Sequence, residues 1–340
     1  MSHHQPTVLS GMRPTGRLHL GHYLGAIKNW VALQETHRCF FAVVDWHALA
    51  GEGYKKSKEI VDSTREMVLD WLACGVDPAR ATVFVQSHVK EHAELHLLLS
   101  MITPTPWLIR NPAVKDQARD LGLVKEGEDV TAIDYGYLGY PVLQAADILL
   151  YDASDVPIGE DQLPHLELTR EIARRFNFIF GETFREPASK LTEVPRLPGV
   201  DGKKMSKSLD NCIYMTEDDK AVQKKVRRMV TDTAKVRLGD KGNPAVCSVF
   251  AYHKIFTKPA LAEIDAGCRS GALGCGDCKN QLTSSIVTLT TPIRDKRATL
   301  PTSMADEILA NGQKRAAKIA AATMARARKA AGLAPYPCAV

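Results

Sequence analysis

Short apolar runs alternate with longer amphipathic stretches through the first part of the chain. The runs at residues 7–9, 40–44 and 82–86 are compact and rich in β-branched and aromatic residues, so each predicts a buried strand. Residues 57–75 show helical spacing, with Ser57 as a candidate N-cap and a glycine at the end. Because strands that alternate with helices pair in parallel, the pattern predicts a doubly wound, Rossmann-like α/β sheet.

The pattern changes in the middle of the chain. Residues 101–139 lose the regular alternation and contain three prolines, so we interpret them as an insertion between the two halves of the sheet. Further helices are expected at residues 141–152 and 161–177. After residue 208 the chain is expected to be helical throughout, and an Ala/Arg/Lys-rich helix is expected at residues 312–331.

These elements divide the chain into two expected domains. Residues 1–208 would form the α/β nucleotide-binding domain, and residues 209–340 an α-helical domain whose last helix is free to pack back on the first. The hydrophobic fraction of 45% and charged fraction of 24% are typical of a globular protein. No apolar run approaches the roughly 20 residues of a membrane helix, and the first residues carry no secretory signal. We therefore expect a cytoplasmic protein that does not enter membranes.

Charge is distributed unevenly along the chain. The net charge of +5 divides into −6 for residues 1–203 and +11 for residues 204–340. A basic second half can be a set of solvated helix faces, but it also fits a domain that meets a polyanion.

A glycine-bracketed segment follows the first predicted strand and precedes a helical pattern. It contains Gly11, Gly16 and Gly21, which let the backbone approach a ligand closely, and the pair His19 and His22, which can donate to phosphate oxygens. A turn from strand to helix also offers free backbone N–H groups to a phosphate. The segment therefore indicates a nucleotide site.

The most informative motif lies at residues 204–208, after a Pro/Gly-rich run. Lys204 and Lys207 stand three apart, separated by Met205 and Ser206 and followed by Ser208. Ammonium groups on a mobile loop can stabilise the charge that develops when a phosphoryl bond breaks. Alone, the motif is equally compatible with a solvated basic turn.

Together, in this order and roughly 180 residues apart, the two motifs resemble the two signatures of the class I aminoacyl-tRNA synthetases. Residues 140–151 and 156–162 resemble the tryptophanyl-tRNA synthetases in particular. The resemblance runs from Leu9 to Leu333. It implies an enzyme that uses ATP and Mg²⁺ to join L-tryptophan to tRNA(Trp), and a homodimer with residues 101–139 at the subunit interface.

Asp147 is the expected recognition residue for the amino acid. The indole N–H is only a donor, and a carboxylate within an otherwise apolar helix is a suitable acceptor. An internal structural role for Asp147 is the plain alternative. The resemblance implies further pocket positions at Leu9, His47, Tyr140, Gln144 and Gln162; Gln144 departs from the methionine that is common in the family.

The resemblance also assigns the ATP site. It places Arg13, Pro14, Thr15, Gly21 and His22 around the phosphates, Gly159, Glu160 and Asp161 at the ribose, and Leu197 near adenine. Lys204 and Lys207, with Met205, Ser206 and Ser208, would close on the phosphates, and His19 would assist catalysis. Many relatives add a cation from the insertion, for which Lys115 and Arg119 are both candidates.

Four of the eight cysteines have a spacing that suggests a metal site: Cys247, Cys268, Cys275 and Cys278. The short loop between the last two occurs in both zinc and iron–sulfur sites, and the spacing alone does not choose between them. A subset of bacterial tryptophanyl-tRNA synthetases carries a [4Fe–4S] cluster on a similar pattern. The resemblance therefore favours [4Fe–4S], with Zn²⁺ and unliganded buried cysteines as alternatives.

Three other functions fit parts of the pattern. A tyrosyl-tRNA synthetase would share both signatures, a small-molecule nucleotidylyltransferase would share the first, and a non-catalytic RNA-binding paralogue would share the fold. The residues around Asp147, the long basic helical half and the two intact signatures argue against each in turn.

Overall fold

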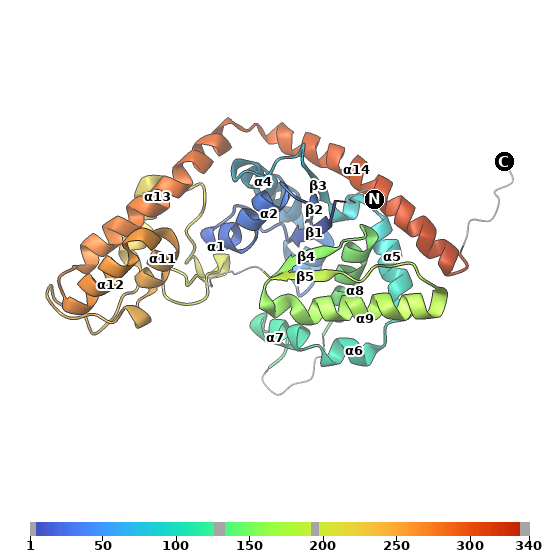
Figure 1. Ribbon diagram of the computed structural model, residues 1–340, viewed down its shortest axis with the longest axis horizontal. Coiled ribbons are helices and arrows are strands. Elements are labelled where there is room, and N and C mark those ends of the chain that lie inside the picture. Colours follow the sequence, from blue (N-terminus) through green and yellow to red (C-terminus); the bar gives the residue numbers. More distant parts are fainter. Residues whose placement is uncertain (1–4, 126–132, 192–196, 334–340) are drawn as a thin grey trace.

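A five-stranded parallel sheet forms the centre of the molecule (Figure 1). The structure is a computed structural model that describes residues 5–125, 133–191 and 197–333. The strand order is β3-β2-β1-β4-β5, with every neighbouring pair parallel. The strands are β1 (Thr7–Met12), β2 (Arg38–Val43), β3 (Ala81–Val85), β4 (Asp155–Ile158) and β5 (Ala188–Leu191). The doubly wound α/β fold is thereby confirmed.

Successive side chains of each strand point to opposite faces of the sheet, so the apolar residues of the strands lie in two separate cores. Val8 and Phe41 face one core, formed with α2 and α4, whereas Leu9, Phe40 and Phe84 face the other, formed with α5, α8 and α9. This alternation is the period-two geometry of a strand buried on both faces. The helices of this part are α1 (Leu20–His22), α2 (Lys28–Leu33), α3 (Asp45–Leu49), α4 (Ile60–Ala73), α5 (Glu91–Ser100), α6 (Thr105–Arg110), α7 (Pro112–Asp120), α8 (Tyr135–Leu150) and α9 (Leu163–Phe180).

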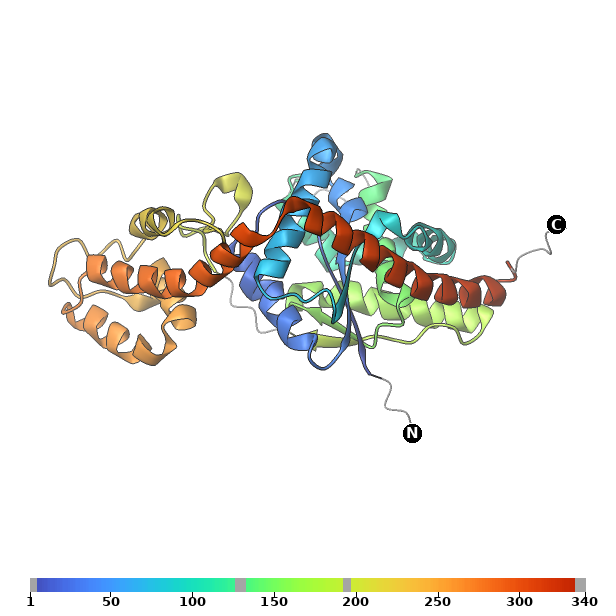
Figure 2. The ribbon, with the colours of Figure 1, turned by 90° about the horizontal axis from the view of Figure 1, so that it is seen from above.

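The second part of the chain is helical but interrupted. Its helices are α10 (Asp219–Arg228), α11 (Ser248–Phe256), α12 (Leu261–Ser270), α13 (Cys275–Thr299) and α14 (Thr302–Ala330). Figure 2 shows α11 to α13 as a lobe beside the sheet domain, from which α14 returns across it. Residues 229–247 contain only one short helical turn, so the expectation of helix throughout this half is wrong. No helix in the described ranges has the length and apolarity to cross a bilayer.

Helix α14 covers the exposed edge of the sheet. β3 is an edge strand, and a Cβ on Gly312 would lie 1.7 Å from the carbonyl oxygen of Val83. The Nη2 of Arg315 also donates to the carbonyl of Ala81 at 3.1 Å. Only glycine permits this approach, and the covered edge is protected from pairing with another chain.

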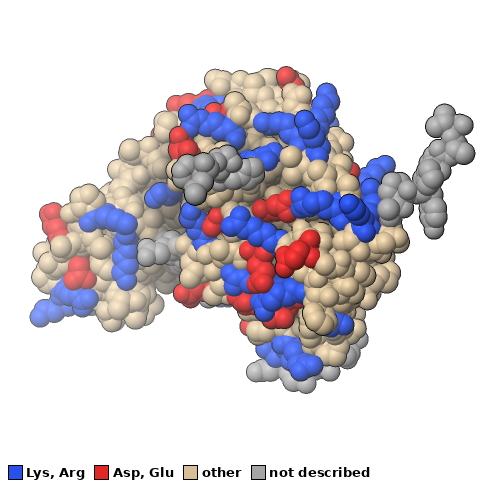
Figure 3. All heavy atoms as spheres, turned by 45° about the vertical axis from the view of Figure 1, so that its right-hand side comes forward, with Lys and Arg blue, Asp and Glu red and all other residues tan. Residues whose placement is uncertain are grey.

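Ion pairs fasten the far end of α14 to the α/β domain. Arg326 pairs with Asp152 at 2.7 Å, and Arg328 pairs with Glu94 on α5. The face in Figure 3 carries Lys and Arg interleaved with Asp and Glu. The basic excess of the second half is therefore partly neutralised by acidic residues of the first.

Several element boundaries differ from the sequence expectations. α4 begins at Ile60 with Glu59 as its N-cap, and Ser57 lies in a preceding 3-10 segment, so the serine cap is wrong. α8 begins six residues earlier than expected because Pro141 is accommodated inside the helix, and α14 begins ten residues earlier. The insertion contains α6 and α7, whose prolines stand in the first helical turns, where a missing N–H is harmless.

Candidate active site

A cavity of about 460 Å³ opens where the carboxyl ends of β1 and β4 diverge. The two strands share a single paired position, Val8 with Asp155, and then separate. This is the point at which the strand order reverses, where doubly wound sheets bind ligands. All six residues expected to bind the amino acid line this cavity: Leu9, His47, Tyr140, Gln144, Asp147 and Gln162. Of the expected ATP residues, Arg13, Thr15, His22 and Gly159 line the same cavity.

Asp147 is a buried carboxylate held by three donors. Gln86 Nε2 donates to both of its oxygens at 2.8 Å, His92 Nδ1 donates at 2.6 Å, and His47 Nε2 donates at 3.0 Å. The other nitrogen of His92 accepts from the hydroxyl of Tyr151 at 2.8 Å. Burial alone would raise the pKa of Asp147, but the hydrogen bonds from His47 and His92 bring it below its usual range. Asp147 is therefore a fixed anion that is 3% exposed.

Tyr140 forms an aromatic wall of the cavity and uses its hydroxyl elsewhere. The hydroxyl donates to Gln117 Oε1 at 2.8 Å and accepts from His165 Nε2 at 2.7 Å. This arrangement suits a neutral His165, whose pKa burial lowers to about 4. Because the hydroxyl of Tyr140 is already bonded, its ring is the part that can contact a ligand. The ring centroids of Tyr140 and His47 lie 6.1 Å apart in an edge-to-face arrangement.

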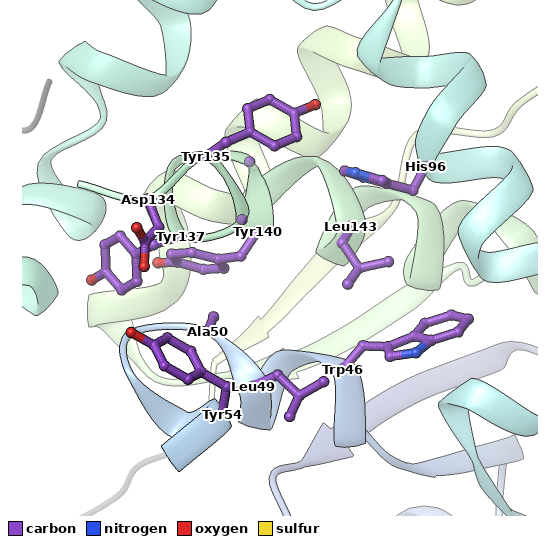
Figure 4. A pocket seen from close by; sticks show the side chains of 13 residues that line it. Trp46, Leu49, Ala50, Tyr54, His96, Asp134, Tyr135, Tyr137, Tyr140 and Leu143 are labelled. Carbon is purple, nitrogen blue, oxygen red and sulfur yellow. The ribbon is translucent and has the colours of Figure 1, made fainter. Parts of the chain in front are cut away.

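A second, apolar cavity of about 280 Å³ lies on the other side of Tyr140. Figure 4 shows Tyr140 and Leu143 of α8 facing Trp46 and Leu49 of α3 across it. The two cavities share Ala50, Tyr137 and Tyr140. The ring of Tyr140 therefore separates the main cavity from this second, apolar one.

The two histidines of the first signature cap each other. His19 Nδ1 accepts from the backbone N–H of His22 at 3.3 Å, His22 Nδ1 accepts from that of His19 at 3.4 Å, and the rings stack 3.7 Å apart. Burial and the charge of Lys207 lower the pKa of His19 to about 4, and burial also holds the pKa of His22 well below its usual value. Both rings are therefore neutral near pH 7. Because each Nδ1 accepts, each proton resides on Nε2, which becomes the available donor.

The lysine loop lies against this turn, with its two lysines in different environments. Lys207 Nζ donates to the carbonyl of Thr15 at 2.6 Å, and burial lowers the pKa of Lys207 to about 8. Lys204 is 82% exposed and pairs with Asp120 of the insertion at 2.6 Å. Met205 packs near Gly21, where a Cβ would lie 3.3 Å from its sulfur. A glycine there lets the two signatures meet.

Asn211, which follows the lysine loop in the sequence, holds the loop in place through its side-chain amide. It was not predicted from the sequence. It is 1% exposed, and its Oδ1 accepts from the backbone N–H of Ser206 at 2.7 Å. Its Nδ2 donates to Asp201 Oδ1 at 2.8 Å and to the carbonyl of Lys204 at 3.0 Å. One buried amide therefore ties together the two ends of the loop.

The remaining candidates lie around the cavity rather than in it. Glu160 and Asp161 are exposed on the turn after β4, Pro14 is buried beside Arg13, and Leu197 is buried in the core shared with α2 and α4. On α7, Arg119 pairs with Asp116 of the same helix, while Lys115 is absent from the cavity lining. The side chain of Ser208 lies outside the described residues.

The four spaced cysteines lie at the lobe formed by α11, α12 and α13. Cys247 is the N-cap of α11, Cys268 lies in the last turn of α12, and Cys275 and Cys278 lie in the first turn of α13. Burial, followed by the charges of the other three cysteines, raises the pKa of the Cys278 thiol to about 12. Among the residues the structure describes, no three His, Cys, Asp or Glu side chains converge closely enough to hold one metal ion.

Comparison with known proteins decides between the alternatives. The profile of the family described as "tRNA synthetases class I (W and Y)" matches residues 1–291. A tryptophan–tRNA ligase of Thermotoga maritima is 45% identical over 331 residues, covering 96% of this chain and 99% of that protein. The corresponding enzyme of Aquifex aeolicus is 43% identical over 96% of this chain and 99% of its own length. This chain belongs to the class I tryptophanyl-tRNA synthetases.

The fold agrees with this membership. The tryptophanyl-tRNA synthetase of Campylobacter jejuni, solved with ADP and tryptophan, superposes with a TM-score of 0.80 at 34% identity, covering 96% of this chain and all of that one. The comparisons therefore favour a synthetase over a nucleotidylyltransferase or a non-catalytic paralogue, and a tryptophanyl-tRNA synthetase over a tyrosyl-tRNA synthetase.

Of the three side chains that hold Asp147, only His47 was named from the sequence; Gln86 and His92 were not. Gln86 follows β3 directly, and a polar residue at the carboxyl end of a buried parallel strand is a usable signal. His92 and Tyr151 carry no such signal, because each is a single polar group on a helix or at its end. Gln117, which accepts from the hydroxyl of Tyr140, is one polar residue on a polar helix and carries no such signal either.

Proposed function

We propose that this synthetase activates L-tryptophan with ATP to tryptophanyl-adenylate, releases diphosphate, and transfers the tryptophanyl group to tRNA(Trp), releasing AMP. The observation that carries the proposal is the single cavity that holds the Asp147 carboxylate together with residues of the first signature. Such a cavity can place an amino acid carboxylate next to the α-phosphate of ATP.

The indole would enter with its N–H toward Asp147. Each oxygen of that carboxylate already accepts two hydrogen bonds, so the indole N–H would take the place of one of them, that of His47, whose ring also lines the cavity. The faces of the indole would pack between Tyr140 and the apolar end of β1 near Leu9. Gln144, Gln162 and His47 also line the cavity and offer polar groups to the ammonium and carboxylate of the substrate.

ATP would lie across the divergence of β1 and β4. The Nε2–H groups of His19 and His22 are suited to donate to phosphate oxygens, and Arg13, Pro14, Thr15 and Gly21 form the surrounding turn. Gly159, Glu160 and Asp161 follow β4, where carboxylates can accept from ribose hydroxyls. We assign Leu197 to the adenine side of the site by resemblance.

The chemical step would be an in-line attack of the tryptophan carboxylate on the α-phosphate. Lys204 and Lys207 would stabilise the charge that develops on the diphosphate leaving group, with Met205, Ser206 and Ser208 completing the loop. Mg²⁺, which accompanies ATP, would supply further neutralisation of phosphate oxygens. Lys204 reaches the phosphates only after leaving Asp120, so loop closure exchanges one anionic partner for another. Whether Lys115 or Arg119 of the insertion also reaches the phosphates stays a prediction.

Alanine variants of the two lysines test this assignment in tryptophan-dependent ATP–diphosphate exchange. Lys204→Ala and Lys207→Ala should each lower kcat at least about a hundredfold, since transition-state charge contacts are worth about 3 kcal/mol each. Lys203→Ala, at the exposed neighbouring lysine, is the matched control and should retain the wild-type rate. Unchanged rates in both signature variants would remove the loop from the mechanism.

Partners and domains follow from the same assignment. We propose an α/β catalytic domain over residues 1–208, with residues 101–139 at a homodimer interface, and a tRNA-binding helical domain over residues 209–340 in a cytoplasmic enzyme. The excess of basic residues after Lys204 supports contact with tRNA. Large exposed apolar side chains of the insertion, among them Met101 and Tyr135, support subunit contact.

We further propose that Cys247, Cys268, Cys275 and Cys278 hold a [4Fe–4S] cluster. Three of them stand at the starts of two helices of one lobe, Cys247 at α11 and Cys275 and Cys278 at α13. A single Zn²⁺ with bonds of about 2.3 Å needs its sulfurs within about 4 Å of one another, whereas a cluster binds each thiolate at a separate iron. The Cys275 and Cys278 pair in the first turn of α13, with Cys247 and Cys268 on the adjoining helices, supports a metal site, and the resemblance to cluster-bearing relatives favours iron–sulfur over zinc. Bound there, the cluster would be a structural group of the helical lobe.

Metal analysis of anaerobically purified protein tests this assignment. Brown protein with about four irons per chain is expected for a [4Fe–4S] cluster. Colourless protein with stoichiometric zinc would support the alternative. Cys74→Ser, at a cysteine outside the lobe, should leave the metal content unchanged.

A further inference from the structure

Asp70 lies where the catalytic domain, the first signature and the helical domain meet. It is on α4 and is 1% exposed. Its Oδ2 accepts from the backbone N–H of Leu18 at 2.7 Å, and its Oδ1 accepts from Nε of Arg297 at 3.1 Å. Arg297 also donates from Nη2 to Glu66, one turn earlier on α4, at 3.0 Å. These groups lie outside the lining of the cavity.

Leu18 immediately precedes the histidine pair and is held on two sides. Its carbonyl accepts from the N–H of Met215, and the N–H of Leu20 donates to the carbonyl of Ile213, both at 2.9 Å. Asp70 receives its N–H from the opposite side. The segment that carries His19 is therefore held between Asp70 and residues 213–215, which follow the lysine loop.

Arg297 brings the helical domain into this arrangement. It lies in the last turn of α13, the helix whose first turn carries Cys275 and Cys278. Burial raises the pKa of Asp70, while the Leu18 N–H and Arg297 act in the opposite direction. Removing the guanidinium would leave a buried carboxylate without its counter-charge, a costly arrangement that a side chain relieves by moving or taking up a proton. Either response weakens its hold on Leu18.

We propose that Asp70 and Arg297 are positioning residues for ATP, through which α13 of the helical domain fixes the turn that carries His19 and His22. The inference rests on the proposed function, because it takes ATP as the ligand of that turn. It predicts an effect on ATP that tryptophan does not share, since Asp147 is held by a separate network of Gln86, His92 and His47.

A second pair on the same helix provides the matched control. Arg65 of α4 pairs with Asp306 of α14 at 2.9 Å, which also joins the sheet domain to a helix of the second half. Within the described ranges, neither residue of this pair forms a hydrogen bond or ion pair with residues 18–22. Its loss would reproduce a general loosening of the two parts without touching the signature turn.

The test is steady-state exchange kinetics for Arg297→Gln, Arg297→Lys, Asp70→Asn and Asp306→Asn, with active enzyme counted by adenylate burst. Arg297→Gln and Asp70→Asn should raise the KM for ATP about tenfold, the size of one lost charged hydrogen bond, with the KM for tryptophan within about twofold of wild type. Arg297→Lys should recover most of the ATP affinity, and Asp306→Asn should match wild type in both constants.

The inference would be overturned by an unchanged KM for ATP, by equal rises in the KM values for ATP and tryptophan, or by an equal rise in Asp306→Asn. A reduced burst with unchanged KM values would also overturn it, because that pattern reports unfolded protein rather than a displaced turn. Wild-type protein without tryptophan-dependent exchange would instead contradict the proposed function itself.

Discussion

Replacing Asp147 with asparagine tests whether the buried carboxylate recognises the indole N–H. Three donors surround it, from Gln86, His92 and His47, at 2.6–3.0 Å. An asparagine amide offers one acceptor oxygen and turns the other position into a donor that faces donors. The variant therefore loses both the charge and at least one hydrogen bond at the floor of the cavity.

The size of the effect follows from the charge of the acceptor. A hydrogen bond to a charged group contributes about 1.5–3 kcal/mol, and about 1.4 kcal/mol corresponds to a factor of ten. We therefore expect kcat/KM for tryptophan to fall about ten- to a hundredfold in Asp147→Asn, with the KM for ATP little changed. Breaking a buried charged network also destabilises the fold, so active enzyme must be counted in each preparation.

A double-mutant-type cycle, in which the enzyme loses the carboxylate and the substrate loses its indole N–H, isolates the contact between Asp147 and the indole. β-(3-Benzothienyl)alanine replaces the indole N–H by sulfur and keeps the shape of the ring. Wild type should prefer tryptophan over this analogue by about ten- to a hundredfold in exchange, and Asp147→Asn should treat the two nearly equally. Asp45→Asn is the matched control, because Asp45 is a neighbouring carboxylate bonded to Ser87 and absent from the cavity lining. A preference that survives in Asp147→Asn would refute the reasoning.

Three further predictions concern stability. Gly312→Ala should destabilise the fold by about 1–3 kcal/mol in urea unfolding, because α14 must move away from β3, whereas Gly136→Ala, with open space around it, should not; equal effects would contradict the close approach. Burial lowers the pKa of His19 to about 4, so between pH 7 and pH 4 the unfolded chain binds a proton that the folded chain does not. The free energy of unfolding should therefore decrease as the pH falls, by about 2 kcal/mol at pH 5 from His19 alone. A His19→Asn variant whose stability depends on pH as steeply as that of the wild type would contradict this. Cys275→Ser should lower the iron content and the thermal midpoint together, and a loss of iron with no change in midpoint would show that the cluster is not structural.

The sequence was sufficient for the parts of the fold that rest on local pattern. β1, β2 and β3 coincide with three apolar runs, because strands buried on both faces need continuous apolar sequence. β4 and β5 were missed, since each has four residues, β4 contains Pro157 and β5 is largely exposed. Their sequences do not differ from those of loops.

The site was predictable to the extent that its residues belong to motifs. All six amino-acid candidates line one cavity because the strand ends and α8 bring them there. The supporting groups could not be found, because they act through tertiary contact: Asn211 organises the lysine loop from outside the motif, and Arg297 reaches Asp70 from 227 residues away. The position of Lys204 on Asp120 likewise depends on how the insertion folds.

Tryptophan-dependent ATP–diphosphate exchange, compared with tyrosine-dependent exchange on the same preparation, tests the central claim most directly. The Asp147 carboxylate and the first signature at one cavity, with Lys207 of the second signature bonded to Thr15 at its rim, predict rapid exchange with tryptophan and negligible exchange with tyrosine. Exchange that is faster with tyrosine, or absent with both amino acids in protein of known active content, would contradict the account.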